Sequence, residues 1–472
     1  MTDNIPYRFD VTRTAASLHE EFDALETGAE TGTTVTVSGR VMLRRVQGKI
    51  AFAQLQDSTG RIQLFAGSAF TEGYGELTAL SLGDWIGATG EVVKTRTGEL
   101  SVKVASWTLL AKARRQFPDK WHGLSDVDTR YRQRYVDLVV TEESRRTFLL
   151  RSRAVTYIRR ELEARVFLEV ETPILHAVPG GAAARPFVTH HNSLDMDLYL
   201  RIAIELHLKR LIVGGLERVY EIGRVFRNEG LSPRNLPEFT MLELYQAYAD
   251  YHDMMQLTEE LVAGAAQALC GTTKLTYGGR ELDLTPPWRR ASLAALAEEQ
   301  IGEHVGLDLS LAELRAVAAR HQVPVEDAWG PGKVLLEVYE KTTETKLWGP
   351  VFVCDYPKEV SPLARAHRDD PRLVERFEPV VAGRELGNAY SELVDPVEQR
   401  ARFEEQALSR AAGDEEAMLI DDDFLRALEY GLPPTGGLGI GIDRLVMLLA
   451  DVDTIRDVVL FPTLRPEQGP GT

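Results

Sequence analysis

Apolar and polar residues alternate in short runs through the first quarter of the chain. Such alternation is typical of strands with one buried face, and Gly, Asp and Ser turn signals separate the runs. Five runs are expected to be strands within residues 37–110: VSGRVMLRRV, IAFAQLQDSTG, RIQLFAG, DWIGATGEVVKT and ELSVKVASWTLL. Five short strands with turns between them predict a small closed β-barrel over residues 37–112.

The pattern changes after the barrel. Residues 113–143 are charged and contain a proline, which indicates a linker that enters a helical hinge. Residues 143–167 have apolar positions at the 3.6-residue spacing of a long helix. Strand patterns and helix patterns then follow as far as residue 466, with a helical insertion at about 253–322. The sequence therefore predicts an α+β protein, with the barrel in front of a larger domain over 144–466.

The two ends of the chain differ from the rest. Residues 1–36 form a short acidic segment, in which apolar residues at helical spacing predict a helix at 11–27. Residues 467–472 are polar and expected to be disordered. The chain does not begin with a basic stretch followed by an apolar one, and no apolar run reaches about 18 residues. We therefore expect a cytoplasmic protein without a membrane span.

Charge is distributed unevenly along the chain. The formal net charge is -17, which disfavours non-specific binding to nucleic acid. Residues 37–120, however, hold 12 basic and 7 acidic residues, so the basic block coincides with the predicted barrel. The two cysteines exclude a disulfide framework and a zinc ribbon. Contact with nucleic acid is therefore expected at the barrel rather than elsewhere.

Three barrel residues suit the recognition of single-stranded nucleic acid. Phe52 and Gln63 lie on neighbouring predicted strands, beside Arg45. An aromatic ring can stack on a base, while polar side chains can contact its edge and its phosphate. This combination favours an oligonucleotide-binding fold, or OB-fold. The alternative is that Phe52 belongs to the barrel core.

A predicted hairpin carries charge where a buried strand would have aliphatic residues. Since side chains alternate along a strand, two sets share a face: Glu221, Arg227 and Glu229 on strand 219–229, and Phe239, Glu243 and Tyr245 on the returning strand. Arg227 can orient a phosphate, Phe239 can stack on a base, and Glu243 can accept a hydrogen bond from an ammonium group. An internal Arg–Glu network that needs no ligand is the alternative.

Alternating glycines leave one face of a later strand bare. Gly437, Gly439 and Gly441 share that face, and Arg444 follows them at the start of a predicted helix. Interior glycines weaken a strand, so their use indicates close approach by something flat. A purine over the bare face, with its phosphates near Arg444, fits this pattern. Tight packing of a helix on the sheet is the alternative.

Acidic residues gather in neighbouring segments. Glu378 and Glu385 form a carboxylate pair that suits Mg²⁺ bridging phosphate oxygens. The alternative for this pair is one exposed acid and one salt-bridged acid. A further polar set is expected to form one pocket: Asn388, Tyr390 and Glu392 on the next strand face, and Glu205 among apolar residues. Two or three acids beside an aromatic wall predict a pocket for a cationic group.

Long stretches of the chain resemble one family. They run in a single order from about residue 37 to 466, and include RRVQGKIAF, RYRQRYVDL, PGGAAARPFVTHHN, PEFTMLELYQAYADY, YPKEVSPLA, RFEPVVAGRELGNAYSEL and GLPPTGGLGIGIDR. On these motifs the chain resembles the class II aminoacyl-tRNA synthetases, and most closely the bacterial lysyl-tRNA synthetases. The resemblance implies an anticodon-reading OB-fold barrel, a class II antiparallel sheet flanked by helices, and a homodimer formed around residues 150–180.

The resemblance also implies substrates and the roles of residues. Lysine would react with ATP to give lysyl-adenylate and then be transferred to the 3′-terminal ribose of tRNA(Lys), with Mg²⁺ as cofactor. ATP would contact Arg227, Glu229, Phe239, Arg444 and the glycine face at Gly437, Gly439 and Gly441, with Arg227 and Arg444 in catalysis. Lysine would contact Gly181, Glu205, Glu243, Tyr245, Asn388, Tyr390 and Glu392. Glu378 and Glu385 would hold Mg²⁺, and Arg45, Phe52, Gln63 and Glu99 would meet the anticodon.

The sequence departs from the family pattern at several positions. In the loop between the hairpin strands, Asn235 and Leu236 stand where the family has histidine and asparagine. Ile204 replaces a usual proline, His207 a tyrosine and Val394 an asparagine, while an acidic segment replaces a basic N-terminal helix. We expect the activation chemistry to survive these changes, while the rate and the tRNA affinity depart from those typical of the family.

Three other functions fit part of the pattern. An aspartyl or asparaginyl enzyme would share the hairpin residues, but the acidic pocket opposes an anionic substrate. A paralogue that forms lysyl-adenylate but transfers lysine to an acceptor other than tRNA fits the altered loop and the missing basic helix, although the barrel disfavours it. A non-enzymatic binding protein would not need the ATP, metal and lysine positions together.

Overall fold

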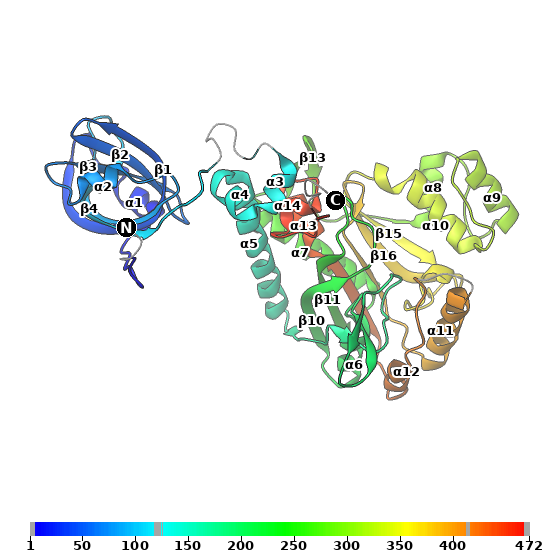
Figure 1. The fold of residues 1–472 in the computed structure, drawn as a ribbon. Coiled ribbons are helices and arrows are strands. Elements are labelled where there is room, and N and C mark those ends of the chain that lie inside the picture. Colours follow the sequence, from blue (N-terminus) through cyan, green and yellow to red (C-terminus); the bar gives the residue numbers. More distant parts are fainter. Residues whose placement is uncertain (1–4, 118–123, 125, 412–415, 467–472) are drawn as a thin grey trace, which may run out of the picture. The chain divides into compact units, whose positions relative to one another are not determined.

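The computed structural model of the chain describes residues 5–117, 124, 126–411 and 416–466 (Figure 1). The chain divides into two compact units, Met1–Ser125 and Asp126–Thr472. The tail predicted at 467–472 lies outside the described residues. Within the described ranges, the protein has no helix that is both long and apolar enough to cross a membrane.

The first unit is a closed five-stranded barrel, as the sequence predicts. Its strands are β1 (Glu30–Gln47), β2 (Ile50–Gln56), β3 (Arg61–Gly67), β4 (Trp85–Lys94) and β5 (Leu100–Ala111), and they pair in the order β1-β2-β3-β5-β4. Alternate side chains point inward, so Ala51, Ala53 and Leu55 of β2 are buried while Phe52 and Gln54 are only half-buried. Because the barrel closes, it has no free strand edge.

The acidic segment at 1–36 is not separate from the barrel. β1 begins at Glu30, seven residues earlier than predicted. Its first residues are mostly exposed, so buried and exposed positions do not alternate there and the sequence gives no strand signal. Helix α1 (Ala15–Phe22) is capped by Thr14 and buries Ala15 and Leu18 in the barrel core, to which α2 (Tyr74–Thr78) also contributes. The barrel domain therefore includes the predicted N-terminal helix.

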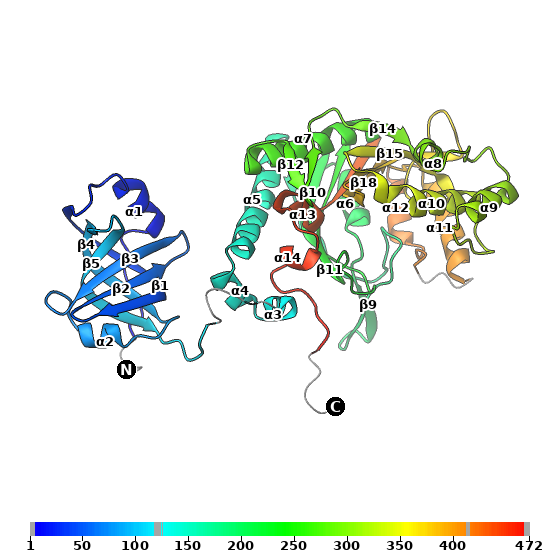
Figure 2. The same cartoon turned by 90° about the horizontal axis from the view of Figure 1, so that it is seen from above.

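The second unit is built on a nine-stranded sheet (Figure 2). Its order is β14-β15-β16-β18-β19-β11-β10-β6, with β17 paired to β16. The strands are β6 (Leu168–Glu169), β10 (Arg218–Phe226), β11 (Glu238–Ala247), β14 (Arg289–Ser292), β15 (Val351–Pro357), β16 (Leu373–Val381), β17 (Arg384–Glu385), β18 (Gly387–Ser391) and β19 (Thr435–Gly441). Most neighbours are antiparallel, while β14 with β15 and β10 with β6 are parallel. The predicted antiparallel sheet is therefore confirmed, with a parallel pair at each end.

Three long elements pack on this sheet and share its main core: α5 (Glu142–Ala164), α7 (Tyr251–Cys270) and α13 (Ile442–Ala450). In α7, Leu261, Val262 and Ala265 are almost fully buried in that core, so α7 is not part of an insertion. A second cluster of apolar side chains joins α8 (Leu293–Ile301), α9 (Leu311–Arg320) and α10 (Pro331–Thr342) to β15 and β16. The prediction of a helical insertion at 253–322 is wrong at its start and its end, because the separate cluster spans α8 to α10.

The residues between the barrel and α5 are not all a linker. Helices α3 (Val127–Arg132) and α4 (Arg134–Val140) belong to the second unit. Arg134 is fully buried, where it forms an ion pair with Asp137 at 2.5 Å and donates to the backbone oxygen of Arg456. Removing one member of such a buried pair would be costly, so this segment is part of the folded unit rather than a hinge.

The remaining elements complete the second unit. A three-stranded sheet consists of β7 (Leu175–His176), β8 (Val188–His191) and β9 (Met196–Leu200), and β12 (Lys274–Tyr277) forms a hairpin with β13 (Arg280–Asp283). The other helices are α6 (Glu205–Val213), α11 (Pro396–Ala411), α12 (Asp422–Glu429) and α14 (Ile455–Val458), with short 3-10 turns η1 (Glu344–Lys346) and η2 (Lys358–Val360). Leu208 of α6 and Phe424 of α12 share a buried cluster, which fixes α6 beside the sheet.

Candidate active site

A cavity of about 400 Å³ opens over the middle of the nine-stranded sheet. Its floor comes from alternate residues of β11, β18 and β19, because side chains on one face of a strand recur every second position. Nearly all residues predicted for the catalytic site line it: Gly181, Glu205, Arg227, Glu229, Phe239, Glu243, Tyr245, Glu378, Glu385, Asn388, Tyr390, Gly437, Gly439, Gly441 and Arg444. Glu392 is the exception. The cavity has a size typical of small-molecule sites.

Arg227 and Phe239 lie together at one end of the cavity. The Arg227 guanidinium is 5.2 Å from the centre of the Phe239 ring. β10 ends at Phe226 rather than at residue 229, so Arg227 and Glu229 stand in the loop that follows the strand. Glu221 does not join them, because it forms an ion pair with Arg201 at 2.6 Å outside the cavity. The internal Arg–Glu network therefore exists, but Arg227 is not in it.

The carboxylate pair and Arg444 form the polar wall at the same end. Arg444 contacts Glu385 at 3.0 Å, and Arg376 contacts Glu378 at 2.6 Å, so both acids are ion-paired rather than one. Burial, together with the charge of Glu385, raises the pKa of Glu378 to about 7. Burial and the charges of Glu378 and Glu385 raise the pKa of Glu344 to about 7. These carboxylates repel one another, and a cation between them would relieve that repulsion.

The opposite end of the cavity holds the acidic pocket. Glu205 begins α6, and one of its carboxylate oxygens accepts a hydrogen bond from the Tyr390 hydroxyl at 2.5 Å. Its other oxygen contacts the ammonium group of Lys209, one helical turn later, at 2.5 Å. The Lys209 ammonium also forms an ion pair with Glu392, which is buried behind the cavity wall. The structure thus brings Glu205 and Glu392 together through a cation that the sequence analysis did not consider.

Glu243 lies between the two ends. It is buried, and its carboxylate accepts a hydrogen bond from the Ile204 backbone amide at 3.0 Å. Burial raises the pKa of Glu243 to about 7. Gly181 approaches this region with a φ of +86°, and an added Cβ would lie 3.1 Å from the Ala203 Cβ, so a side chain at Gly181 would be strained and crowded.

The glycine face of β19 is only partly bare. A Cβ at Gly437 would overlap a carboxylate oxygen of Glu392 and lie 2.6 Å from the Tyr245 ring. At Gly439 the nearest atom would be the flexible end of Met241, at 3.1 Å. All three glycines line the cavity, but the close approach at Gly437 comes from the protein itself.

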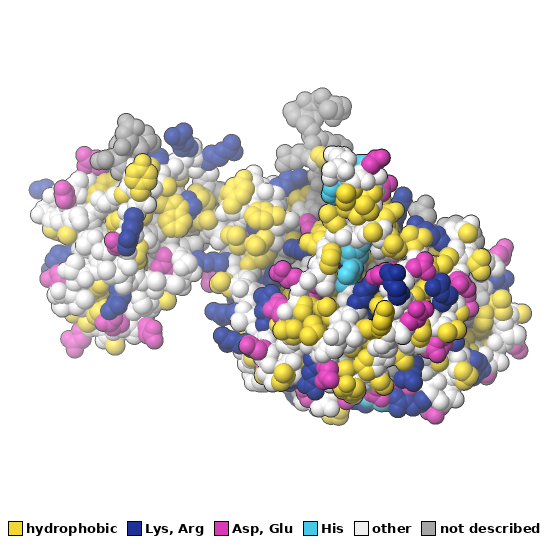
Figure 3. Space-filling view, turned by 90° about the horizontal axis from the view of Figure 1, so that it is seen from below, with side chains coloured by type: hydrophobic (Ala, Val, Ile, Leu, Met, Phe, Trp, Pro, Cys, Tyr) yellow, Lys and Arg dark blue, Asp and Glu magenta, His cyan; other side chains and the backbone are white. Residues whose placement is uncertain are grey.

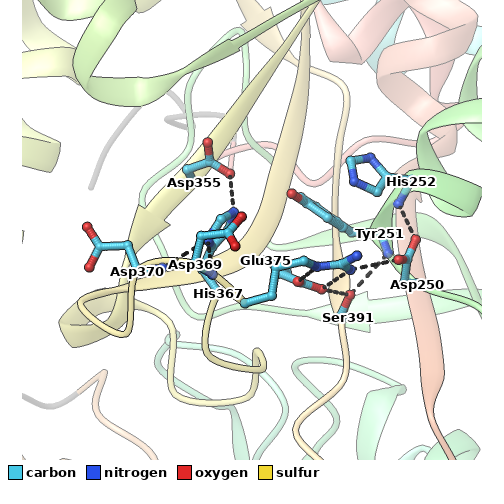
Figure 4. Close-up of polar contacts among 10 residues, drawn as sticks. Asp250, Tyr251, His252, Asp355, His367, Asp369, Asp370, Glu375 and Ser391 are labelled. Atoms are coloured by element: carbon cyan, nitrogen blue, oxygen red, sulfur yellow. Dashed lines mark hydrogen bonds and ion pairs between the residues drawn. The ribbon is translucent and has the colours of Figure 1, made fainter.

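A network on the other face of the sheet holds β18 in place (Figure 4). The Ser391 hydroxyl donates to Glu375 at 2.6 Å and accepts from the Tyr251 amide at 3.1 Å. Arg368 joins Glu375 to Asp250, the residue that caps α7. Since Ser391 stands between Tyr390 and Glu392, this network fixes the end of the strand from which both pocket residues project.

Comparison with known proteins agrees with this geometry. The family of tRNA synthetases class II (D, K and N) matches residues 126–465, and an OB-fold nucleic acid binding domain matches residues 35–110. The chain is a class II tRNA synthetase. Among its relatives, a lysine–tRNA ligase of Synechococcus sp. (strain CC9311) is 55% identical and covers 98% of this chain and 96% of its own. One from Halalkalibacterium halodurans is 53% identical over 98% of this chain and 94% of its own.

The barrel of the synthetase presents aromatic side chains on its outer face. Phe52 stacks on Phe65 with ring centres 5.2 Å apart, and it lies outside the buried core, so the alternative that it is a core residue is wrong. Arg45 is directly opposite Phe52 on the neighbouring strand. Gln63 lies on the next strand and donates to Ser101 at 2.9 Å. Glu99 is exposed in the turn before β5.

Two residues of the site in the synthetase, Arg376 and Lys209, were not predicted from the sequence. Arg376 donates to Asn388 at 2.9 Å as well as to Glu378, so it orients both side chains. Arg376 and Glu378 are two apart in one strand, and this spacing could have indicated a shared face. Lys209 gave no signal, since a lysine in a short amphipathic helix is usually exposed.

The departures from the family pattern have structural positions. Leu236 is buried in the main core, and Asn235 lines the cavity, with its backbone N–H donating to the Ser232 hydroxyl. The ring of His207 lies 4.5 Å from that of His176, and burial lowers its pKa to about 4, so it is neutral at physiological pH. Ile204 and Val394 pack in the cluster around α6. Of these positions, Asn235 and Leu236 line the cavity, so the change from histidine to Asn235 bears directly on the site.

Proposed function

We propose that this synthetase is a lysine–tRNA ligase, which activates lysine with ATP and transfers it to tRNA(Lys). The observation that carries the proposal is that one cavity has an acidic end and a basic end. Buried carboxylates stand at one end, beside the Tyr390 ring, and Arg227 with Arg444 stands at the other. A substrate with two ammonium groups suits Glu243 and the acidic pocket. The relatives that bear the name lysine–tRNA ligase support the same substrate.

In the first step, the lysine carboxylate attacks the α-phosphorus of ATP in line, and pyrophosphate leaves. No side-chain nucleophile is needed, so catalysis rests on positioning and charge neutralisation. Phe239 stacks on the adenine, the Arg227 guanidinium binds the phosphate as the negative charge shifts, and Arg444 binds the far phosphates. In the second step, the 3′-hydroxyl of the terminal tRNA ribose attacks the acyl carbon of lysyl-adenylate, and AMP leaves.

Glu378 and Glu385 are the residues that would hold Mg²⁺ together with the ATP phosphates. Their mutual repulsion, and the raised pKa of Glu378 near 7, fit a divalent cation. No group of three or more Asp, Glu, His or Cys side chains in the described segments is arranged to hold a metal ion. A metal bound mainly through substrate phosphates and one or two carboxylates agrees with this. When bound, it would neutralise charge on the phosphates.

The OB-fold barrel supports tRNA as the acceptor. Stacking of anticodon bases on Phe52, with contacts from Arg45, Gln63 and Glu99, is the role proposed for its outer face. This argues against the paralogue that transfers lysine to another acceptor. An aspartyl or asparaginyl activity is disfavoured because an anionic side chain would meet Glu205 and Glu392. A cytoplasmic location stays a prediction.

A homodimer is part of the proposal. Large apolar side chains are exposed in one stretch of the second unit: Val166, Leu168, Ile174, Leu175, Val188 and Leu194. Figure 3 shows hydrophobic side chains gathered in patches between charged ones on one face of the protein. Patches of exposed apolar side chains favour association with another chain. Gel filtration with light scattering would test this, and a monomer at micromolar concentration would contradict it.

A charging assay tests the function. The protein is incubated with ATP, magnesium, radiolabelled lysine and tRNA, and lysyl-tRNA is measured beside lysine-dependent exchange of pyrophosphate into ATP. The proposal expects both activities. Exchange without lysyl-tRNA would favour the paralogue, and neither activity with lysine but charging with aspartate or asparagine would favour the other members of the family.

A further inference from the structure

Lys209 occupies an unusual place for a lysine. Its side chain is fully buried, and its ammonium group lies between Glu205, at 2.5 Å, and Glu392. The rings of Tyr390 and Phe424 are within 5.7 and 5.9 Å of it. The protein thus places a positive charge of its own against the two carboxylates that are expected to recognise the positive side chain of the substrate.

Such an arrangement is costly for folding alone. Removing an ammonium and two carboxylates from water carries a desolvation penalty that their attraction only partly offsets, and apolar residues of similar volume often do as well. Local helix stability does not require it either, since an exposed i,i+4 pair would serve. The position of the ion triplet directly behind the substrate cavity indicates a role in binding.

The carboxylate oxygens are not equally occupied. Both oxygens of Glu205 have partners, Lys209 and the Tyr390 hydroxyl. One oxygen of Glu392 contacts Lys209, whereas its Oε1 is buried and has no hydrogen-bond partner among the described residues. That oxygen lies over Gly437, where the absence of a side chain leaves room for it. An unpaired buried carboxylate oxygen can accept a hydrogen bond from a donor that enters the pocket.

We propose that Lys209 is a positioning residue, whose fixed ammonium aligns Glu205 and Glu392 and cancels one of their two charges, so that the pocket presents a single net negative charge to the ammonium of the substrate. This inference rests on the proposed function. A pocket with one net negative charge becomes neutral when one ammonium group binds. Two uncancelled carboxylates would instead compete for a proton.

Two opposed influences act on the protonation of Glu392. Burial raises the pKa of Glu392 well above its ordinary value, and the charge of Lys209 opposes that rise. Burial alone would lower the pKa of Lys209, but Glu205 and Glu392 outweigh it, so its pKa is raised and the ammonium stays charged. The other titratable groups that face Glu392 are Glu205 of α6, Glu243 and Tyr245 of β11, and Tyr390 of β18.

The test compares four variants in lysine-dependent pyrophosphate exchange between pH 6 and 9. They are Lys209→Met, Lys209→Arg, Lys209→Met with Glu392→Gln, and Lys333→Met, which removes an i,i+4 Lys–Glu pair on α10, away from the cavity. In Lys209→Met the lysine KM should rise about 10- to 100-fold at pH 7 with the ATP KM unchanged, because a charged partner is lost at one substrate only. Its lysine KM should then fall as pH rises, because Glu392 loses its proton.

The other variants separate this role from a structural one. The second substitution, Glu392→Gln, should abolish the pH dependence that Lys209→Met introduces, and Lys209→Arg should restore part of the lysine affinity. Lys333→Met should behave as the wild type. If Lys209→Met is folded by circular dichroism but has the wild-type lysine KM, or loses lysine and ATP affinity equally, the inference is wrong.

Folding and function are kept apart by two further readouts. If Lys209→Met does not fold, Lys209→Arg decides: a folded arginine variant whose lysine KM matches that of the wild type at every pH contradicts the role in alignment, and a raised lysine KM with a normal ATP KM supports it. Calorimetric titration of the wild type with lysine separates the two proposals. A wild type that neither binds nor activates lysine overturns both, whereas a lysine-active wild type with unaffected variants overturns only the role of Lys209.

Discussion

The two ends of the cavity use charge in opposite ways. At the acidic end, Lys209 and Glu392 are almost completely buried, and their charges are paired inside the protein. At the nucleotide end, the side chains of Arg444 and Glu385 are each 37% exposed, and their contact can be exchanged for one with a ligand. Charges that are buried and prearranged discriminate between substrates, whereas half-exposed charges can follow a reaction in which charge moves.

The largest effect is expected at the nucleotide end. Arg227→Ala should lower lysine-dependent pyrophosphate exchange by about a thousandfold, because the transition state loses a charged, two-pronged partner. Arg227→Lys is the matched control, since it keeps the positive charge but not the two-pronged guanidinium. Its exchange rate should lie between those of the wild type and Arg227→Ala. Near-normal exchange in a folded alanine variant would show that this end does not carry the chemistry.

The acidic end should instead govern the choice of substrate. Norleucine lacks the ε-ammonium group and would leave the negative charge that Lys209 does not cancel without a counter-ion, at a cost of about 2–5 kcal/mol. Comparison of kcat/KM for lysine and norleucine in the exchange assay measures this. Glu392→Gln should lower the ratio of kcat/KM for lysine to that for norleucine. Glu404→Gln, which replaces an exposed carboxylate on α11, should leave this ratio unchanged. Equal activation of the two amino acids would refute the assignment of the pocket.

Two glycines of β19 allow the ends to be separated within one strand. Gly437→Ala should raise the lysine KM about tenfold, because its Cβ overlaps Glu392 and displaces it. Gly439→Ala makes a tight contact only with the flexible end of Met241, so the lysine KM should stay normal while the ATP KM rises. Lysine and ATP titrations of both variants provide the measurement. The same change in lysine KM for both would contradict the division of the cavity.

The smallest effect concerns pH. The pKa of Glu243 is about 7 in the folded protein, against an ordinary 4.5, so its contribution to folding stability falls as pH rises through that window. Binding of the substrate ammonium needs the ionised form, so kcat/KM for lysine should rise about tenfold from pH 6 to 8. Glu243→Gln should lower kcat/KM and lack this rise. A wild-type profile that is flat over this range would show that Glu243 is ionised throughout.

Much of the site could be predicted from the spacing of residues. Phe239, Glu243 and Tyr245 share a strand face, and alternation placed them correctly on the cavity floor. Alternation predicts which face of a strand a side chain is on, but not how deeply it is buried. Glu392 was expected beside Tyr390 on one face, but β18 ends at Ser391 and Glu392 lies behind the cavity wall. The partner of Glu392 comes from a helix far away in sequence, and no local pattern could supply it.

The fold was similarly predictable where burial is periodic. The barrel strands were recognised because buried and half-buried residues alternate, as in β2. The start of β1 was missed because its first residues are mostly exposed on both faces. The predicted linker at 113–143 extends too far, because charged residues such as Arg134 are expected to be exposed. Only the ion pair with Asp137 explains how the Arg134 side chain is buried.

The bonds of Ser391 behind β18 have a consequence for inhibitors. Glu375 and the backbone amide of Tyr251 bond to that strand on the face away from the cavity, while Lys209 forms ion pairs with the pocket carboxylates. Because of these bonds, widening the acidic pocket to admit a bulkier compound would cost free energy. Compounds aimed at it should gain potency from shape and length matched to the resting protein, and one extra methylene before the terminal amine should weaken inhibition about 10- to 100-fold.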